Sequence, residues 1–500
     1  MTGLRNTNEL EQLLRQAGLL TGTAGEPVPF TGVSNNSAET EAGDLFICKG
    51  FGFKPAYLHM AEDKGAAVYL AETPIEGAVI PFVQVSDVRK AQSLIARAFY
   101  QNPSESFTLI GITGTKGKTT TAYDMKAILD DCSGVPTGLL STVERFVGEE
   151  HEPSHLTTPE SLDLQRLLAT ARDHEMPYVT MEVSSQAYKM ERVAGEYFDF
   201  GLFLNFGEDH ICAHEHPDLE DYFACKLRLM KSCRTAVICR ETDRFEQVYA
   251  AALSHAEQVV TVGMEREDCD YAAVEIQKTD RGFRFRVREK DGSLSCIYSL
   301  LQEGRFNVEN ALAAIAVGRE LCFTHENMAA ALAGLTVPGR MNLMEGDGVR
   351  VLVDYAHNRL SFEALFSSLQ QDYPNAELIS VAGAPGERDP ARVTDIGSLC
   401  GKYADVAYFT SDDPGFEDPL DLCTRMASAA RSAGNAEIHI VTDRAQAVEM
   451  AVRQAPRGSV VVLAGKGHEV TQRIRGRYEP YESDAAVARR VLDERIGAQK

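Results

Sequence analysis

The chain has 500 residues, of which 44% are hydrophobic. A chain of this length is too long for one core and predicts about two to four domains. Its net charge of −23 argues against a nucleic-acid partner held through phosphates and against an acidic membrane surface. The amino terminus is polar, no apolar run approaches the roughly 20 residues of a membrane span, and the eleven cysteines lack CxxC or zinc-like spacing. We therefore expect a cytoplasmic protein with reduced thiols.

The order of predicted elements divides the chain into three α/β domains. Residues 1–104 form the first and end in a linker-like Gln-Asn-Pro-Ser segment, residues 105–337 form the second, and Pro338-Gly339 opens the third, over 338–500. In the first we predict helices over 8–20 and 57–64 and strands over 44–48 and 67–70. In the second we predict strands over 178–183, 201–206, 236–239 and 283–287 and helices over 221–230 and 307–321.

A glycine-rich segment near the start of the second domain has the context of a phosphate-binding loop. Gly111-Ile112-Thr113-Gly114-Thr115-Lys116-Gly117-Lys118-Thr119-Thr120-Thr121 follows an apolar strand over 107–110 and precedes a helix over 122–130. Backbone N–H groups of such a loop contact phosphate oxygens, Lys118 would reach the β- and γ-phosphates, and Thr119 would help to hold Mg²⁺. Ile112 stands where the strict pattern has Gly, so a glycine-rich turn with an incidental Lys is the alternative.

The third domain shows the most regular alternation of strands and helices. Its predicted strands cover 349–353, 378–381, 406–410, 438–441 and 460–463, with helices between them. That order predicts a mostly parallel sheet with right-handed crossovers, and ligands of such sheets gather at the carboxyl ends of the strands. Polar clusters stand at those ends, over 354–358, 383–389, 411–419 and 465–469.

Two residues of the second domain are candidate metal ligands. Glu182 lies at the end of a predicted strand, where a carboxylate is a natural Mg²⁺ partner for ATP, although a solvated Glu is the alternative. His210 is the candidate second ligand, and His214 and His216 are expected to be loop residues because no zinc-like spacing includes them.

Four further sites stay open on residue type alone. Lys226 lies on a predicted amphipathic helix, where a solvated Lys is the usual case, and Thr157-Thr158-Pro159 is an ordinary turn and helix start. Arg340 and Arg388 follow glycine-containing turns, and each is either a surface Arg or a group that binds phosphate or carboxylate through its planar fork.

Together these segments resemble the Mur ligases over nearly the whole chain. The matching segments are 113–119, 157–160, 181–185, 205–210, 222–226, 304–310, 338–340, 354–358 and 465–469, in that order. The resemblance is nearest to the members that add the third residue of the peptidoglycan stem. It implies an N-terminal domain for the uridine side of the substrate, a central P-loop ATPase-like domain with a parallel sheet, and a C-terminal Rossmann-like domain that binds the amino acid.

The family resemblance implies an ATP-dependent amide ligase that works through an acyl phosphate. A carboxylate is a poor electrophile, and phosphoryl transfer gives it a leaving group before an amine attacks. The implied substrates are ATP, UDP-MurNAc-L-Ala-D-Glu and a diamino acid, with Mg²⁺ as cofactor. From charge and family we expect no nucleic-acid or membrane partner and a monomer.

The resemblance also assigns roles to single residues. ATP would be bound by Gly114, Thr115, Lys116, Gly117, Lys118, Thr119, Thr120, Asn307, Arg340 and Asp354. The muramoyl-dipeptide would be bound by Ser37, Thr157, Thr158, Ser184 and Arg192, and the amino acid by Arg388, Asp412, Asp413, Gly465 and Glu469. Thr119, Glu182 and His210 would be metal ligands, and Lys118, Glu182, His210 and Lys226 would be catalytic. Lys226 matches the lysine that family members carbamylate, which makes it an anion able to support a second Mg²⁺.

Departures from the family pattern bear on the substrate. Lys116 stands where many members have Asn, and Asn36-Ser37-Ala38 differs from the usual Asp-Ser-Arg. Members that add diaminopimelate have Asn then Pro-Arg, whose Arg grips the distal carboxylate, whereas this chain has Asp413-Pro414-Gly415. Asp413 would place negative charge near a distal ammonium, so we expect L-lysine, with L-ornithine and meso-diaminopimelate as alternatives. Arg388 would hold the α-carboxylate, and Glu469 would lie near the amine.

Two other classes of function remain open. The first is an ATP ligase with another substrate, either another Mur step or a folylpolyglutamate synthetase-like reaction. The second is a catalytically inactive nucleotide-binding regulatory protein. The extra N-terminal domain favours the tripeptide step, and the set of Lys118, Glu182, His210 and Lys226 argues against an inactive protein.

Overall fold

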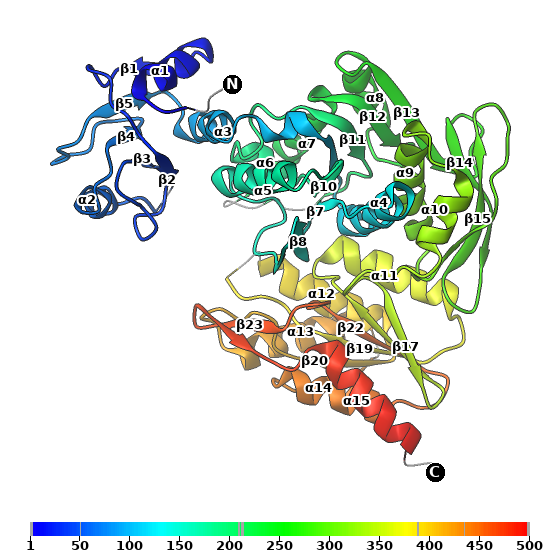
Figure 1. The fold of residues 1–500 in the computed structure, drawn as a ribbon. Coiled ribbons are helices and arrows are strands. Elements are labelled where there is room, and N and C mark those ends of the chain that lie inside the picture. The colour runs from blue at the N-terminus through cyan, green and yellow to red at the C-terminus, as the bar shows by residue number, and fades with distance from the viewer. Residues whose placement is uncertain are drawn as a thin grey trace.

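Three sheets, each covered by helices, make up the chain (Figure 1). The computed structural model describes residues 4–50, 52–208, 211, 215–387, 390–434 and 436–497. Each sheet falls inside one of the three residue ranges expected from the sequence, and the fold is α/β as predicted. Within the described residues, no helix is both long enough and apolar enough to cross a membrane, and no described cysteine forms a disulfide.

The N-terminal sheet has five short strands. β2 to β5 run parallel, and β1 pairs antiparallel with β5 at the edge. After α3 the chain turns through Gln101 and Asn102, both in left-handed backbone, into a 3₁₀ turn at Pro103–Ser106 where the linker was expected. The elements are α1 (Thr7–Gln16), β1 (Leu20–Gly22), β2 (Gly32–Ser34), β3 (Asp44–Ile47), α2 (Pro55–Asp63), β4 (Val68–Ala71), β5 (Phe82–Val85) and α3 (Val88–Phe99).

The central sheet has eleven strands and a parallel middle. Its strands are β6 (Thr108–Thr113), β7 (Gly138–Leu140), β8 (Glu144–Val147), β9 (Glu150–Pro153), β10 (Tyr178–Glu182), β11 (Phe198–Phe203), β12 (Cys233–Cys239), β13 (Gln258–Met264), β14 (Tyr271–Lys278), β15 (Phe283–Glu289) and β16 (Tyr298–Leu300). The order is β16-β15-β14-β13-β12-β11-β6-β10-β7-β8-β9. β7 to β9 and β14 to β16 are antiparallel extensions of the two edges.

Helices cover both faces of the central sheet, so its middle strands are buried on both sides. The helices are α4 (Lys118–Ser133), α5 (Ser161–Asp173), α6 (Ser185–Lys189), α7 (Leu219–Leu227), α8 (Phe245–Leu253), α9 (Phe306–Glu320) and α10 (His325–Leu332). α4, α9 and α10 enclose one apolar core, and α5 to α8 enclose the other. This explains why β6, β10 and β11 carry apolar residues on both faces rather than on alternate positions only.

The C-terminal sheet is the parallel sheet that the alternation predicts, with one antiparallel edge strand, β17. Its order is β17-β18-β22-β19-β20-β21, and a separate hairpin, β23-β24, follows it. The strands are β17 (Asn342–Gly346), β18 (Val349–Asp354), β19 (Leu378–Ala382), β20 (Val406–Phe409), β21 (Glu437–Ile440), β22 (Val460–Ala464), β23 (Thr471–Ile474) and β24 (Arg477–Pro480). The helices are α11 (Arg359–Asp372), α12 (Pro390–Tyr403), α13 (Pro419–Ala433), α14 (Arg444–Gln454) and α15 (Asp484–Gly497).

A buried ion pair ties α14 to α15 beneath this sheet's carboxyl edge. The Arg444 Nε and Nη2 atoms donate to the two Asp484 carboxylate oxygens at 2.8 and 2.6 Å, and both side chains are almost fully buried. Arg444 also donates to the Ala464 carbonyl oxygen at 2.8 Å. The pair therefore fixes the end of β22, where the strand enters the 465–469 cluster.

We expect Asp484→Ala to lower the free energy of unfolding of the C-terminal part by about 3–5 kcal/mol, because it leaves the Arg444 guanidinium buried without its main counter-charge. Circular dichroism melting curves and urea denaturation would measure the change. Glu494→Ala is the control, since the Glu494–Arg453 pair lies on the surface and its loss should change stability little. Equal melting of both variants would contradict the structural role of the pair.

Candidate active site

The loop between β6 and α4 is held in shape by the segment that follows β11. The Lys116 N–H donates to Asn205 Oδ1 at 2.8 Å, and Asn205 Nδ2 donates back to the Lys116 carbonyl at 3.1 Å. The Thr115 N–H donates to the Asn205 carbonyl at 3.0 Å, and the Gly207 N–H donates to Thr115 Oγ1 at 3.1 Å. These bonds hold the loop to the segment that follows β11.

The residues of this loop fit a triphosphate. α4 has 16 residues, and its N-cap, Gly117, supplies no side-chain cap, so the first N–H groups of the helix have no acceptor within it. Lys118 Nζ folds back on the loop and donates to the carbonyls of Gly114 and Thr115 at 2.8 and 3.3 Å. Gly114, Thr115, Lys116, Gly117, Lys118, Thr119 and Thr120 thus form one turn around the helix terminus, as the sequence predicts.

Glu182 fits a magnesium ligand. It ends β10, which runs parallel to β6 and pairs Glu182 with Ile112 just before the phosphate loop. Its side chain is buried, and in the part of the chain that the structure describes its two oxygens accept hydrogen bonds only from Thr142, from the N–H at 2.7 Å and from Oγ1 at 3.1 Å. Among the described residues no cation pairs with it, so a divalent ion would supply the missing charge. His210, the other proposed ligand, lies outside the described residues.

Lys226 projects from α7 onto the phosphate loop. Its side chain is 1% exposed, and Nζ donates to the Gly114 carbonyl at 2.7 Å while lying 4.6 Å from the centre of the Tyr222 ring. The Tyr222 hydroxyl donates to Thr115 Oγ1 at 3.2 Å. Lys226 is therefore not the solvated helical Lys that its residue type alone favours, and α7 contacts the phosphate loop through two side chains.

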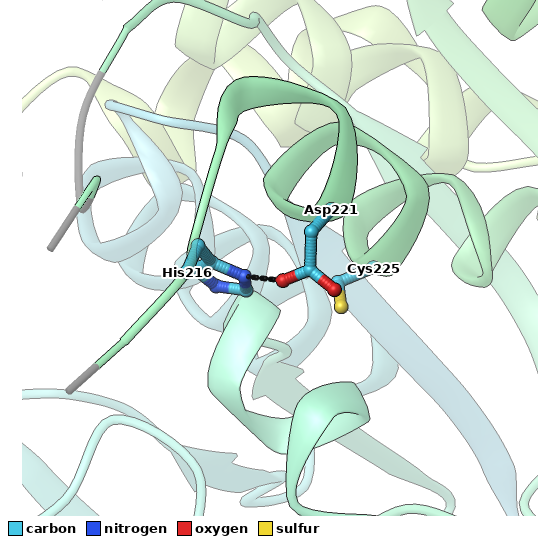
Figure 2. A group of neighbouring side chains, drawn as sticks. All are labelled: His216, Asp221 and Cys225. Carbon is cyan, nitrogen blue, oxygen red and sulfur yellow. Dashed lines mark hydrogen bonds and ion pairs between the residues drawn. The ribbon is translucent and has the colours of Figure 1, made fainter. Parts of the chain in front are cut away.

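His216 lies in the loop before α7, as expected from the sequence, but its side chain is buried. Its Nδ1 lies 2.6 Å from Asp221 Oδ2 and its Nε2 lies 2.9 Å from Ser185 Oγ (Figure 2). Asp221 also accepts from Lys189 Nζ at 2.7 Å, and burial raises the pKa of the nearby Cys225 thiol. His216, Asp221 and Cys225 lie close enough to bind a metal, but protein partners already engage the imidazole and the carboxylate. We interpret the cluster as the tie that fixes α7, and with it Lys226, against α6.

Two side-chain contacts join the C-terminal part of the chain to the phosphate loop. Arg340 Nη2 donates to Thr119 Oγ1 at 3.2 Å, and Lys116 Nζ donates to Asn358 Oδ1 at 2.9 Å. The predicted nucleotide residues from the two sides are thereby brought together. Asn358 was absent from the predicted set, because nothing in the sequence indicates that it would meet a residue 242 positions away.

Asp354 and Asn307 complete the predicted nucleotide set. Asp354 ends β18, and its carboxylate accepts from the Met341 and Ala356 N–H groups at 2.9 and 2.8 Å, while burial raises its pKa. Asn307 lies in the first turn of α9, donates to the Glu303 carbonyl at 2.7 Å and accepts from Asn310 Nδ2 at 2.9 Å. Both side chains have several hydrogen bonds within the protein, so each is held in a fixed orientation.

Four of the five residues predicted for the muramoyl-dipeptide lie next to Glu182. Thr158 Oγ1 donates to the Glu182 carbonyl at 2.9 Å and accepts from the Ser184 N–H at 3.0 Å. Arg192 Nη1 donates to the Thr158 carbonyl at 3.2 Å, and Thr157 Oγ1 lies 3.1 Å from Thr142 Oγ1. Ser37 is buried in the N-terminal part, where its hydroxyl contacts Met60.

The residues predicted for the amino acid gather around a lysine that the prediction missed. Lys466 Nζ donates to Asp413 Oδ1 at 2.9 Å and forms an ion pair with Glu469, and its side chain is almost fully buried. Asp413 is therefore not the free negative charge that we expected for a distal ammonium. Burial raises the pKa of Asp412, beside Gly465, to about 6. Arg388 lies outside the described residues.

Known proteins resemble the chain over almost its whole length. The "Mur ligase middle domain" family matches residues 112–318, and the "Mur ligase, glutamate ligase domain" family matches residues 339–467. A UDP-N-acetylmuramyl-tripeptide synthetase of Lactobacillus delbrueckii subsp. bulgaricus is 39% identical over 505 residues, covering 96% of this chain and 98% of its own. The chain belongs to the Mur ligase family.

Two further Mur ligases bear on the reaction and the fold. A protein of Enterococcus faecalis named UDP-N-acetylmuramoyl-L-alanyl-D-glutamate–L-lysine ligase is 37% identical over 471 residues, with 93% of this chain and 92% of that one covered. A solved structure of a UDP-N-acetylmuramoyl-L-alanyl-D-glutamate–2,6-diaminopimelate ligase is 25% identical, has a TM-score of 0.66 and covers 93% of this chain and 95% of that one. The three-domain Mur ligase fold expected from the sequence is confirmed.

Burial lowers the pKa of His468 to about 4, and the charges of Arg340 and Lys466 add to the effect. The His468 imidazole has the ordinary pKa of 6.5 in the unfolded chain, whereas its pKa in the folded protein is about 4. The unfolded chain therefore takes up this proton first as the pH falls. Stability should therefore fall as the pH drops from 6.5 towards 4, and His468→Gln should flatten that fall. Melting temperatures between pH 4 and 8 would show it, and parallel curves for the two proteins would contradict it.

Proposed function

We propose that this Mur ligase joins a diamino acid to the D-Glu carboxylate of UDP-MurNAc-L-Ala-D-Glu, with conversion of ATP to ADP and phosphate, in the cytoplasm and as a monomer. One observation carries the proposal: side chains of the C-terminal part contact the phosphate loop through Arg340–Thr119 and Lys116–Asn358, and the Tyr355 ring connects Arg340 to Glu469, the ion-pair partner of Lys466. The names of the relatives from Lactobacillus and Enterococcus support it.

In this proposal each of the three parts of the chain has one task. Residues 1–104 bind the uridine side, residues 105–337 bind ATP and the dipeptide end, and residues 338–500 bind the amino acid. The ion pair between Lys49 of the first part and Glu160 of the second, which Arg192 shares at 2.8 Å, supports a substrate path from one part to the other. Ser37 belongs to the same first part and contacts uridine in this arrangement.

The proposed chemistry has two steps. A D-Glu carboxylate oxygen attacks the γ-phosphorus of ATP, which forms an acyl phosphate and releases ADP. The amine then attacks the acyl carbon, phosphate leaves with the C–O bond electrons, and the amine gives up a proton. The terminus of α4 and Lys118 bind the phosphates, and Thr158, Ser184 and Arg192 orient the carboxylate beside them. Thr119, Glu182 and His210 would hold Mg²⁺, which would supply positive charge to neutralise the phosphates.

The catalytic role of Lys226 in this proposal depends on a change of its side chain from a cation to an anion. As an ammonium it donates to the Gly114 carbonyl, whereas a carbamate on Nζ would be a ligand for a second Mg²⁺ on the same side of the loop. We therefore expect a carbamate signal in carbon NMR after incubation with labelled bicarbonate and Mg²⁺, and none in Lys226→Ala. A wild-type spectrum without the signal would leave the ligase proposal intact and refute this role of Lys226.

The amino acid is proposed to be L-lysine, with L-ornithine and meso-diaminopimelate as the alternatives. Three acidic side chains, Asp412, Asp413 and Glu469, surround the Lys466 ammonium, and the buried Arg444, which pairs with Asp484, lies 3.9 Å from Asp412. This excess of negative charge favours a substrate that brings a second cation over one that brings a second carboxylate.

The test is phosphate release with ATP, Mg²⁺ and UDP-MurNAc-L-Ala-D-Glu, in parallel with L-lysine, L-ornithine, meso-diaminopimelate or no amino acid, with products weighed by mass spectrometry. We expect release and a tripeptide with L-lysine. Lys118→Met should lower the rate by about a hundredfold or more, because it removes a charge from the phosphate site. Lys290→Met, on an 82% exposed side chain, is the control. Nucleotide binding without turnover would favour the inactive regulatory protein instead.

A further inference from the structure

Three segments of the C-terminal part are joined by their backbones at one side of the amino-acid pocket. The Gly386 N–H donates to the Asp413 carbonyl at 3.1 Å, and the Gly415 N–H donates to the Arg473 carbonyl at 3.0 Å. The Arg473 N–H donates to Asp413 Oδ1 at 2.8 Å. These bonds hold Glu387, Gly415 and Arg473 next to one another whatever their side chains do.

The backbone at this junction is strained. Glu387 and Asp413 have φ angles of 57° and 45°, and Gly415 has 63°, all in the left-handed region. Residues other than glycine adopt this region at a cost, and such residues gather at ligand sites where the surrounding structure holds them in place. This cost applies to Glu387 and Asp413, which both carry carboxylates, and not to Gly415.

Gly415 leaves room for the Glu387 side chain. A Cβ added at Gly415 would overlap a Glu387 carboxylate oxygen, so Glu387 occupies the volume that any side chain at position 415 would take. The Glu387 N–H is anchored on Glu417 Oε1 at 2.6 Å, which fixes the base of the side chain. The absence of a side chain at position 415 therefore allows the Glu387 carboxylate to lie there.

The Glu387 carboxylate is also the least engaged acid of the pocket. Asp413 and Glu469 pair with Lys466, and Asp412 lies 3.9 Å from the buried Arg444. Glu387 has only Arg473, at 3.7 Å, which is beyond hydrogen-bond range, and its side chain is 38% exposed. Within the described residues its oxygens therefore retain lone pairs for a ligand that can donate.

The charges around the junction select the kind of ligand. Four carboxylates, from Asp412, Asp413, Glu469 and Glu387, face three cations, from Lys466, Arg473 and Arg444, and Arg444 also pairs with Asp484. An ammonium would bring the group closer to neutrality and take the open oxygens of Glu387. A distal carboxylate would have to displace Glu387 from Arg473 and would add to the excess negative charge.

We propose that Glu387 determines specificity by accepting the distal ammonium of the incoming diamino acid, in the space that Gly415 leaves open. This rests on the proposed ligase function and names the group that selects its third substrate. Asp413, which the sequence favoured for that role, instead keeps Lys466 and Arg473 in place.

A substrate and variant cycle tests the proposal. The full-length wild type, Glu387→Gln and Glu387→Asp are each assayed for phosphate release with L-lysine and with L-norleucine, which lacks only the distal ammonium. We expect the wild type to prefer lysine, and Glu387→Gln to lower kcat/KM for lysine by about tenfold or more, mainly through KM, because a charge-assisted hydrogen bond is lost. The value for norleucine should not change, and Glu387→Asp should retain part of the preference.

The controls separate binding from folding and from failure of the ligase proposal. Glu437→Gln, on a 71% exposed side chain of β21, should behave as the wild type, and circular dichroism melting curves should be the same for all variants. An equal loss for lysine and norleucine, or an unchanged lysine KM, would refute the role of Glu387. A higher kcat/KM of the wild type for meso-diaminopimelate than for lysine would also refute the role of Glu387. Arg473 would then be the group that binds the distal carboxylate. A wild type without turnover on any amino acid would refute the ligase proposal itself.

Discussion

The hydrogen bonds between Asn205 and the backbone of Lys116 set the shape of the phosphate loop, and most of the candidate site depends on that shape. They hold the loop from the β11 side, while Lys226 holds the Gly114 carbonyl from the α7 side. α7 is in turn tied to α6 through His216. The loop is therefore held at Lys116 by the segment after β11 and at Gly114 by α7. A shift of α7 would therefore move a loop carbonyl as well as the Lys226 side chain.

Buried charges in this Mur ligase differ in how fully the protein satisfies them. Arg444 and Asp484 pair through two hydrogen bonds and gain nothing from a ligand, so their role is structural. Glu182 is buried to the same degree, yet within the described residues it meets only the N–H and hydroxyl of Thr142. A buried carboxylate without a counter-charge has a high free energy unless a cation binds to it. This cost distinguishes Glu182, a candidate ligand site, from the Arg444–Asp484 pair, which is structural.

The sequence predicted the parts of the fold that local patterns encode. The strands of the C-terminal sheet and the segment from β6 to α4 lie where their apolar runs and glycines place them. The antiparallel edges β7 to β9 and β14 to β16 were mostly missed, because short edge strands with polar residues have weak periodicity. Within the site the phosphate loop was predicted, but the partners of its residues were not.

Pairing between distant segments explains the errors of the site prediction. Asp413 was read as a free charge because Lys466 lies 53 positions away, and only the parallel arrangement of β20 and β22 around β19 brings their following loops together. The partners of His216 were missed for the same reason, since Ser185 and Asp221 belong to α6 and α7. Residue type and local spacing contain no information on such pairs.

The connection between the central and C-terminal sheets packs directly on the amino-acid pocket. A Cβ on Gly339 would overlap the His468 backbone N, so the connecting segment lies against the same loop that carries Lys466 and Glu469. Arg340 then reaches Thr119 on one side and lies 4.5 Å from the Tyr355 ring on the other, while the Tyr355 hydroxyl donates to Glu469 at 3.1 Å. One continuous set of contacts therefore runs from the phosphate loop to the amino-acid pocket. A rotation about the connection would therefore change the contacts at Thr119 and at Glu469 together.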